Sequence, residues 1–124
     1  MAWAQFPTHW LIGAADPDAP SVRRYPLAEL HWRDHRAAGI SALLILIILA
    51  TRLNELSRAA YKAKLSPPND VSVTWTELQR MTGHARATVG KGIVLLESWG
   101  AIRLKRVGRA NQYELVDVRT PGRY

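Results

Sequence analysis

The sequence predicts a mainly helical domain that carries a small β-hairpin, and three observations lead to this fold class. A long apolar segment at 40–50 continues a helical pattern, two shorter helical segments follow around a glycine, and alternating segments lie near the C-terminus. The chain has 124 residues, of which 48% are hydrophobic. This length suits one compact domain, and this composition excludes wholesale disorder.

Residues 1–26 are predicted to form an N-terminal arm that is largely non-helical. Four of the seven prolines lie in this segment, and proline interrupts helices. The arm also holds apolar side chains that can be buried, among them Trp3, Phe6 and Trp10. We therefore expect an extended arm that packs on the body of the protein or on a partner chain.

The pattern after the arm predicts one long helix over about 27–64, or two helices that are separated by a break near Gly39. Its middle, 40–50, is apolar on every side, which is typical of a helix that is covered all round. The uncharged stretch 37–51 has 15 residues, whereas a bilayer span needs roughly 20. We therefore predict a helix inside a core or a dimer interface, and no association with a membrane.

A helix, a turn and a second helix are predicted after a proline-rich breaker at 66–70. Thr74 and Glu77 have the spacing of a capping box at a helix start, and Gly83 supplies the positive φ that a tight turn needs. The predicted elements are a short strand at 71–73, helices at 75–81 and 86–99, and a stop at Gly100. The side chains expected to share a core are Leu78, Met81, Val89, Ile93 and Leu96.

The C-terminal part alternates between apolar and polar residues, which predicts a β-hairpin. Its strands are expected at 101–107 and 112–118, joined by a turn at 108–111 and followed by a loose tail at 119–124. Arg103 and Lys105 of the first strand share one face. Such a charged strand is either a solvated edge that discourages aggregation or a surface that binds an anion.

In this order and spacing, the segments 71–83, 87–89, 96–102 and 109–113 resemble the winged helix-turn-helix family of DNA-binding proteins. The resemblance implies a mainly α fold with a β-hairpin wing, an N-terminal arm and a long apolar helix. The domain would span 27–118, with the helix-turn-helix at 75–99, the wing at 101–118 and the helix of 40–64 as its first helix.

The charge of the chain agrees with an anionic partner. Lys and Arg number 17 against 10 Asp and Glu, which gives a formal net charge of +7. Residues 71–124 carry a net charge of +5, whereas residues 1–70 carry +2. A small protein with this excess binds a polyanion or lies against an anionic membrane, and the excess belongs to the segment that resembles the DNA-binding family.

The resemblance also implies which residues contact double-stranded DNA. A recognition helix presents its N-terminal end to the major groove, where Arg and Lys can reach guanine edges or phosphates. The candidates on this helix are Arg86, Ala87, Thr88, Gly90 and Lys91. The preceding helix crosses the backbone and offers Thr74, Thr76 and Arg80, and the wing offers Arg103, Lys105, Arg106 and Arg109.

Two features depart from the family pattern. Ala85, or His84, stands at the N-cap of the recognition helix, where the family usually has Ser or Thr. Val94, Leu95 and Trp99 occupy positions that are normally polar. We expect these three side chains to be exposed and to contact the long helix or a second chain.

The residues give no sign of catalysis. The chain has no cysteine, which excludes disulfides, thiolate metal sites and cysteine nucleophiles. His31 and His35 have a spacing that can bind a metal, with Asp34 nearby, but a third clear ligand is missing. Phosphate-binding glycine loops, paired carboxylates and nucleophile triads are also missing, so we expect neither an enzyme nor a cofactor or metal.

The favoured interpretation is a cytoplasmic transcriptional regulator similar to the MarR group, of bacterial, plasmid or phage type. It would bind specific DNA sites as a homodimer through the 40–50 helix and the N-terminal arm, because one small domain cannot cover the run 43–49. The alternatives are the DNA-binding domain of a plasmid or phage replication initiator and a winged-helix subunit that binds proteins through the exposed apolar side chains of its second helix. A membrane-associated protein is a fourth option.

Overall fold

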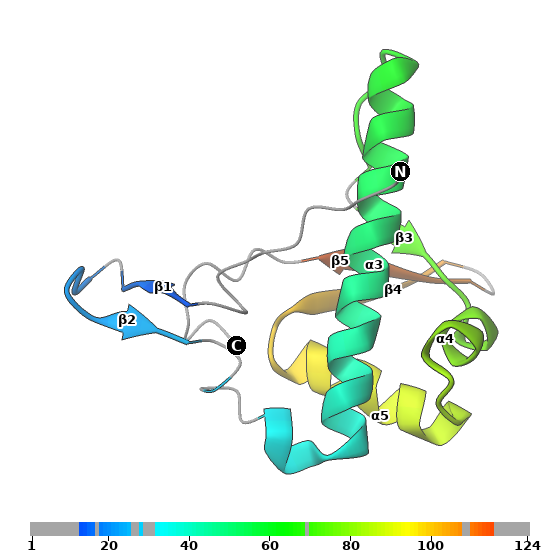
Figure 1. Ribbon diagram of the computed structural model, residues 1–124. Coiled ribbons are helices and arrows are strands. Elements are labelled where there is room, and N and C mark those ends of the chain that lie inside the picture. The colour runs from blue at the N-terminus through cyan, green and yellow to red at the C-terminus, as the bar shows by residue number, and fades with distance from the viewer. Residues whose placement is uncertain are drawn as a thin grey trace.

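The computed structural model describes residues 13–16, 18–25, 28, 32–68, 70–107 and 110–115 (Figure 1). Its elements are β1 (Ala14–Ala15), β2 (Arg23–Arg24), the 3-10 helix η1 (Trp32–His35), α3 (Ala37–Lys62), β3 (Asp70–Ser72), α4 (Trp75–Thr82), α5 (Arg86–Ser98), β4 (Ile102–Val107) and β5 (Ala110–Leu115). The predictions made for the first 12 residues, the tail 119–124, His31 and Arg109 lie outside this part. The mainly helical class with a small antiparallel sheet is confirmed.

The helical break that the sequence placed near Gly39 occurs at Arg36 instead. Arg36 has a φ of 50° and separates η1 from α3. Gly39 lies inside α3, where its missing side chain is required for packing, because a Cβ there would overlap the carbonyl oxygen of Trp32. The sequence signal was read as a break, but the glycine serves the close approach of η1 to α3.

The hydrophobic core lies where α3, α4, α5 and the sheet meet. α3 packs most extensively on α5, and α4 packs on both of them. The largest fully buried side chains of the helices are Ile45, Leu49, Leu78, Ile93 and Leu96. Of the predicted core residues, only Met81 is wrong: it is 43% exposed, because it lies in the last turn of α4 on the side that faces solvent.

α3 has a buried side and a half-exposed apolar side. Ile45 and Leu49 are fully buried, whereas Ile40 and Ile47 are 48% and 41% exposed. The helix contains an 18-residue segment with a mean hydropathy of 1.9, of which 39% is buried, so by length and composition it can cross a membrane. The uncharged stretch of 15 residues underestimated the length of this apolar segment, because a membrane span tolerates a charged residue near its end.

The local signals around the two shorter helices are confirmed. Thr74 caps α4 by accepting a hydrogen bond of 3.1 Å from the Glu77 amide, and Gly83 ends this helix with a φ of 73°. Ala85 precedes α5 and makes no side-chain capping bond, as its methyl group predicts. Gly100 also has a positive φ and turns the chain into β4.

The three-stranded sheet is antiparallel in the order β3-β5-β4. Leu104 pairs with Tyr113 and Val71 pairs with the same tyrosine from the other side, which places the Tyr113 ring in the core. Val107 pairs with Ala110, so the turn is shorter than the predicted 108–111 and the last strand begins two residues earlier. The predicted continuation of this strand to 118 lies outside the described residues.

The described part of the arm contains a small β1–β2 hairpin rather than a purely extended segment. Ala14 pairs with Arg24, and the Asp16 carboxylate accepts hydrogen bonds from the Asp18 amide at 2.8 Å and from the Arg24 guanidinium at 3.1 Å. These two contacts, the Asp18 amide first, hold the pKa of Asp16 below its ordinary value. The hairpin therefore has an electrostatic link that is lost when Asp16 is protonated.

Candidate nucleic-acid interface

The exposed side of α5 begins with a basic turn. Arg86 is the first residue of the helix, and Arg86, Ala87 and Lys91 are exposed, whereas Thr88 and Gly90 are partly buried. Ala85 at the N-cap has no side-chain acceptor, so the first amides of this helix receive no hydrogen bond from it. The structure thus leaves both predicted cations of the helix, Arg86 and Lys91, accessible.

Trp75 organises this end of α5, and sequence reasoning missed it. The Arg86 guanidinium lies over the Trp75 ring at 5.2 Å from the centroid, a cation–π contact. The indole N–H of Trp75 donates a hydrogen bond of 3.2 Å to the Tyr113 hydroxyl. A Cβ at Gly90 would lie 3.2 Å from the ring, so the indole is seated directly against α5. Trp75 therefore connects α4, α5 and β5.

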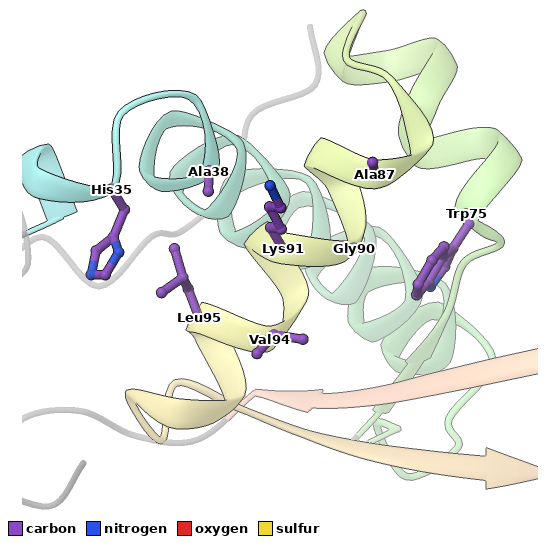
Figure 2. A pocket seen from close by; sticks show the side chains of 8 residues that line it. All are labelled: His35, Ala38, Trp75, Ala87, Gly90, Lys91, Val94 and Leu95. Atoms are coloured by element: carbon purple, nitrogen blue, oxygen red, sulfur yellow. The ribbon is translucent and has the colours of Figure 1, made fainter.

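A hollow of about 510 Å³ lies beside this basic turn (Figure 2). It is lined by His35, Ala38, Trp75, Ala87, Gly90, Lys91, Val94 and Leu95. In Figure 2, His35 stands at one end, Trp75 stands at the other, and the α5 residues lie between them. Most of these side chains are apolar. The hollow thus occupies the same helix face as the predicted DNA-reading residues.

The prediction of three exposed apolar residues on α5 is correct in part. Val94 is 63% exposed and Leu95 is half-buried, and both line the hollow. The prediction for Trp99 is wrong, because its side chain is buried in the core. Trp99 stands at the C-terminal cap of α5, where the chain turns toward β4, and its ring packs 5.9 Å from the ring of His35.

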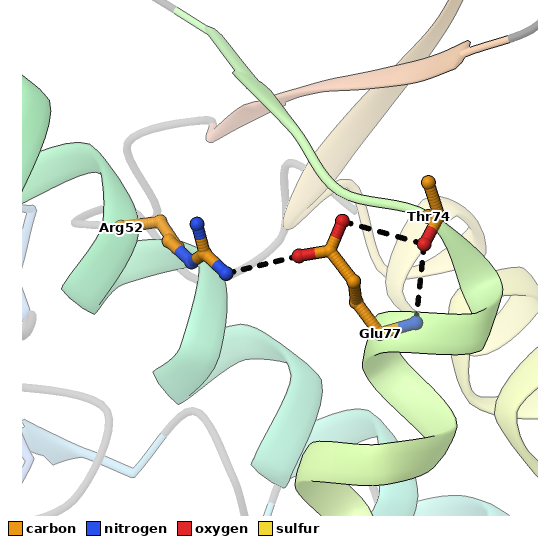
Figure 3. Close-up of polar contacts among 3 residues, drawn as sticks. All are labelled: Arg52, Thr74 and Glu77. Carbon is orange, nitrogen blue, oxygen red and sulfur yellow. Dashed lines mark hydrogen bonds and ion pairs between the residues drawn. The ribbon is translucent and has the colours of Figure 1, made fainter.

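α4 contributes two accessible candidates and one that is already engaged. Thr76 and Arg80 are exposed. The Thr74 hydroxyl donates its proton to the Glu77 carboxylate at 3.4 Å while it accepts from the Glu77 amide (Figure 3). The same carboxylate accepts a hydrogen bond of 3.0 Å from Arg52 of α3. Thr74 is thus part of a link between α3 and α4, and its hydroxyl proton is already donated to Glu77.

The hairpin β4–β5 carries exposed cations whose surroundings differ. Arg103 and Lys105 are both exposed. The Lys105 ammonium lies 3.8 Å from the Asp70 carboxylate and 3.4 Å from the Glu114 carboxylate. The sequence did not predict these pairs, because Glu114 lies on the neighbouring strand β5 and Asp70 lies on β3, on the far side of β5. Arg106 lies in β4, and its side chain, like the whole of Arg109, lies outside the description.

Comparison of the chain with family models, with curated proteins and with solved structures finds no match.

Within the part of the chain that the structure describes, no group of three or more His, Asp or Glu side chains could hold a metal ion. The candidate pair of His31 and His35 is not testable, since His31 lies outside that part. His35 itself packs on Trp99 and lines the hollow. Within the described part of the chain, this surface therefore consists of exposed cations around the apolar hollow.

Proposed function

We propose that this chain is a winged helix-turn-helix protein that binds specific sites on double-stranded DNA and regulates transcription as a dimer. The observation that carries the proposal is the arrangement of α5. Its N-terminal turns are accessible, carry Arg86 and Lys91, and follow α4 through the tight turn at Gly83. An accessible basic helix start of this kind fits the major groove of B-form DNA.

The order of the elements supports the same proposal. A helix, a strand, two helices and a hairpin follow one another, and the hairpin joins the earlier strand in the sheet order β3-β5-β4. In this proposal β4 and β5 are the wing, α5 is the recognition helix, and α4 crosses the phosphate backbone. Exposed cations then occur on all three parts, namely Arg80, Arg86, Lys91 and Arg103.

A second copy of the chain is the proposed cover of the apolar side of α3. Ile40, Leu44 and Ile47 recur at helical spacing, and the first and last of them are about half exposed. α3 also extends beyond the sheet and the other helices in Figure 1, and Tyr61 near its end is 85% exposed. A dimer that forms along this side would bury these side chains and present two copies of α5 to two half-sites.

The first experiment tests whether α5 recognises the base sequence of the DNA. We expect Arg86→Ala or Lys91→Ala to weaken binding to the preferred duplex by about 1–3 kcal/mol and to reduce the preference at particular base pairs. The measurement is fluorescence anisotropy with a preferred duplex, obtained by sequencing the fragments that the purified protein retains, and with its scrambled counterpart. Lys62→Ala is the matched control, because it also removes one exposed cation but lies at the far end of α3. Equal losses in all three variants would contradict sequence reading by α5.

The second experiment tests the two cations of the hairpin. We expect Arg103→Ala to weaken binding to every duplex alike and to reduce the slope of log K against log salt by roughly 0.9, as for one lost phosphate contact. Lys105→Ala should change the slope less, because Asp70 and Glu114 already lie beside its ammonium. The check is a salt titration of both variants. A larger effect for Lys105 than for Arg103 would show that the ion pairs open on binding.

A protein-binding module is the second candidate, and the apolar hollow beside α5 is the observation that favours it. Absence of salt-dependent binding to any duplex, together with capture of a protein through Val94, would favour this candidate. A replication initiator shares the proposed DNA chemistry. It is distinguished by retained fragments that contain tandem origin repeats rather than a promoter site.

A further inference from the structure

The proposed reading surface of α5 is poor in hydrogen-bonding side chains. After Arg86, the exposed or hollow-lining positions of this face are Ala87, Gly90, Lys91, Val94 and Leu95. Lys91 is the one side chain among these five that can donate a hydrogen bond to a base edge. Recognition by bidentate hydrogen bonds is therefore restricted to the first turns of the helix.

Apolar side chains can still distinguish bases in the major groove. Thymine alone among the four standard bases presents a methyl group there, and small apolar side chains contact it. Val94 is 63% exposed, and Ala87 is exposed about two helical turns before it, so both methyl-bearing side chains are accessible from the same side. Gly90 lies between them in the lining of the hollow, with the Trp75 ring 3.2 Å from the position that its Cβ would take.

We propose that the hollow beside α5 reads the methyl groups of thymine, so that the preferred DNA site contains thymines at the base pairs that face Ala87 and Val94. This inference rests on the proposed DNA-binding function and specifies the chemistry of its target. Arg86 and Lys91 supply the contacts to guanine or phosphate at the N-terminal side of the hollow. The apolar residues supply discrimination without hydrogen bonds.

The charges around the hollow favour a duplex over an apolar protein segment as its occupant. Lys91 is part of the lining, and Arg86 lies over Trp75 at the end of the same hollow. A hydrophobic segment that filled the hollow would remove water from the Lys91 ammonium and provide no opposite charge, which is unfavourable. A duplex provides phosphates and guanine acceptors beside the thymine methyl groups. Glu97, the acidic residue of α5, lies in the last turn, away from the basic start.

The test replaces thymine by deoxyuridine, which lacks the methyl group and keeps every hydrogen-bonding atom of the base. The full chain is titrated with its preferred duplex and with duplexes that carry deoxyuridine at single positions. We expect about fourfold weaker binding for each methyl group that contacts the hollow, from the transfer free energy of one buried carbon. The salt slope should not change, because the phosphate contacts remain the same.

Two variants test whether the difference in affinity between thymine and deoxyuridine duplexes arises at the hollow. Val94→Thr keeps the shape of the side chain and replaces one methyl group by a hydroxyl at an exposed position, so the fold is expected to persist. It should reduce the ratio between thymine and deoxyuridine binding at one base pair. Leu65→Ala is the control, because it removes a 67% exposed apolar side chain beyond the end of α3 and should leave the ratio unchanged.

The outcomes separate this inference from the function on which it rests. Sequence-specific, salt-dependent binding with equal affinity for thymine and deoxyuridine duplexes overturns methyl reading and leaves DNA binding in place. A preferred site without thymine opposite α5, or a protein that occupies the hollow while DNA binding is unaffected, also overturns it. Failure to bind any duplex overturns the proposed function and the inference together.

Discussion

Aspartate at position 46 is expected to unfold the protein, whereas aspartate at position 47 is expected to leave it folded and to separate the proposed dimer. Leu46 is 5% exposed in the core, and Ile47 is 41% exposed on the half-exposed apolar side of α3. An unpaired charge in the core costs several kcal/mol, a large part of the 5–15 kcal/mol of a typical domain. From sequence alone the two adjacent substitutions are expected to act alike, because the run is apolar on all sides.

Circular dichroism and sedimentation together distinguish the two effects. Leu46→Asp should lose its cooperative thermal transition, and Ile47→Asp should keep a helical spectrum while it sediments as a monomer. The unsubstituted protein, measured at the same micromolar concentration, is the reference for the dimer. A well-folded monomer of the unsubstituted chain would refute the proposed dimer, and unfolding of both variants would refute the difference in burial.

Gly39→Ala is expected to destabilise the protein, although helix propensity alone predicts the opposite sign. Replacing glycine by alanine inside a helix normally stabilises it by up to about 1 kcal/mol. At this position the new Cβ would overlap the carbonyl oxygen of Trp32, a backbone atom that cannot rotate away. Either η1 must detach or α3 must shift, and overpacking of this kind costs about 1–3 kcal/mol.

Thermal unfolding of Gly39→Ala measures the sign directly. Gly90→Ala on α5 is the matched comparison, because its Cβ would meet the edge of the Trp75 side chain at 3.2 Å rather than a backbone atom. We expect the smaller loss there. A higher melting temperature for Gly39→Ala would mean that η1 is not held against α3 in solution.

The sequence predicted those features that depend on residues close together in the chain. The cap at Thr74 needs only the Glu77 amide three positions later, and the turn at Gly83 needs only a residue that tolerates positive φ. The alternation in β4 likewise follows from neighbouring residues. Such signals survive in any tertiary context, and for this reason the order of the C-terminal elements could be predicted.

The features that the sequence did not predict depend on contacts between distant segments. Trp99 is buried in the core cluster that several elements form together, and the spacing of residues within α5 does not indicate this packing. The ion pairs of Lys105 need β5 beside the hairpin strand β4 and β3 on the far side of β5. The role of Gly39 also requires the position of Trp32 in space.

The sequence predicted which residues form the candidate site, but it did not predict which side chains surround them. Arg86 and Lys91 could be selected as cations at the start of a helix, and the structure leaves both accessible. Trp75, which holds the Arg86 guanidinium, had no recognisable signal, because its partners Arg86 and Tyr113 lie 11 and 38 positions later. The apolar hollow was visible only as Val94 and Leu95, two residues that did not fit the family pattern.

The uneven embedding of α3 gives this helix the properties of a lever. At about 1.5 Å per residue its 26 residues make a rod of roughly 39 Å, continuous from Ala37 to Lys62. One half is clamped against α5, and the other half extends beyond the sheet (Figure 1). A tilt of about 5° around the clamped half moves the free end by roughly 2 Å, the size of the helix shifts that accompany switching at interfaces. A partner that binds the end of α3 near Tyr61 would therefore also act on the part of α3 that packs against α5.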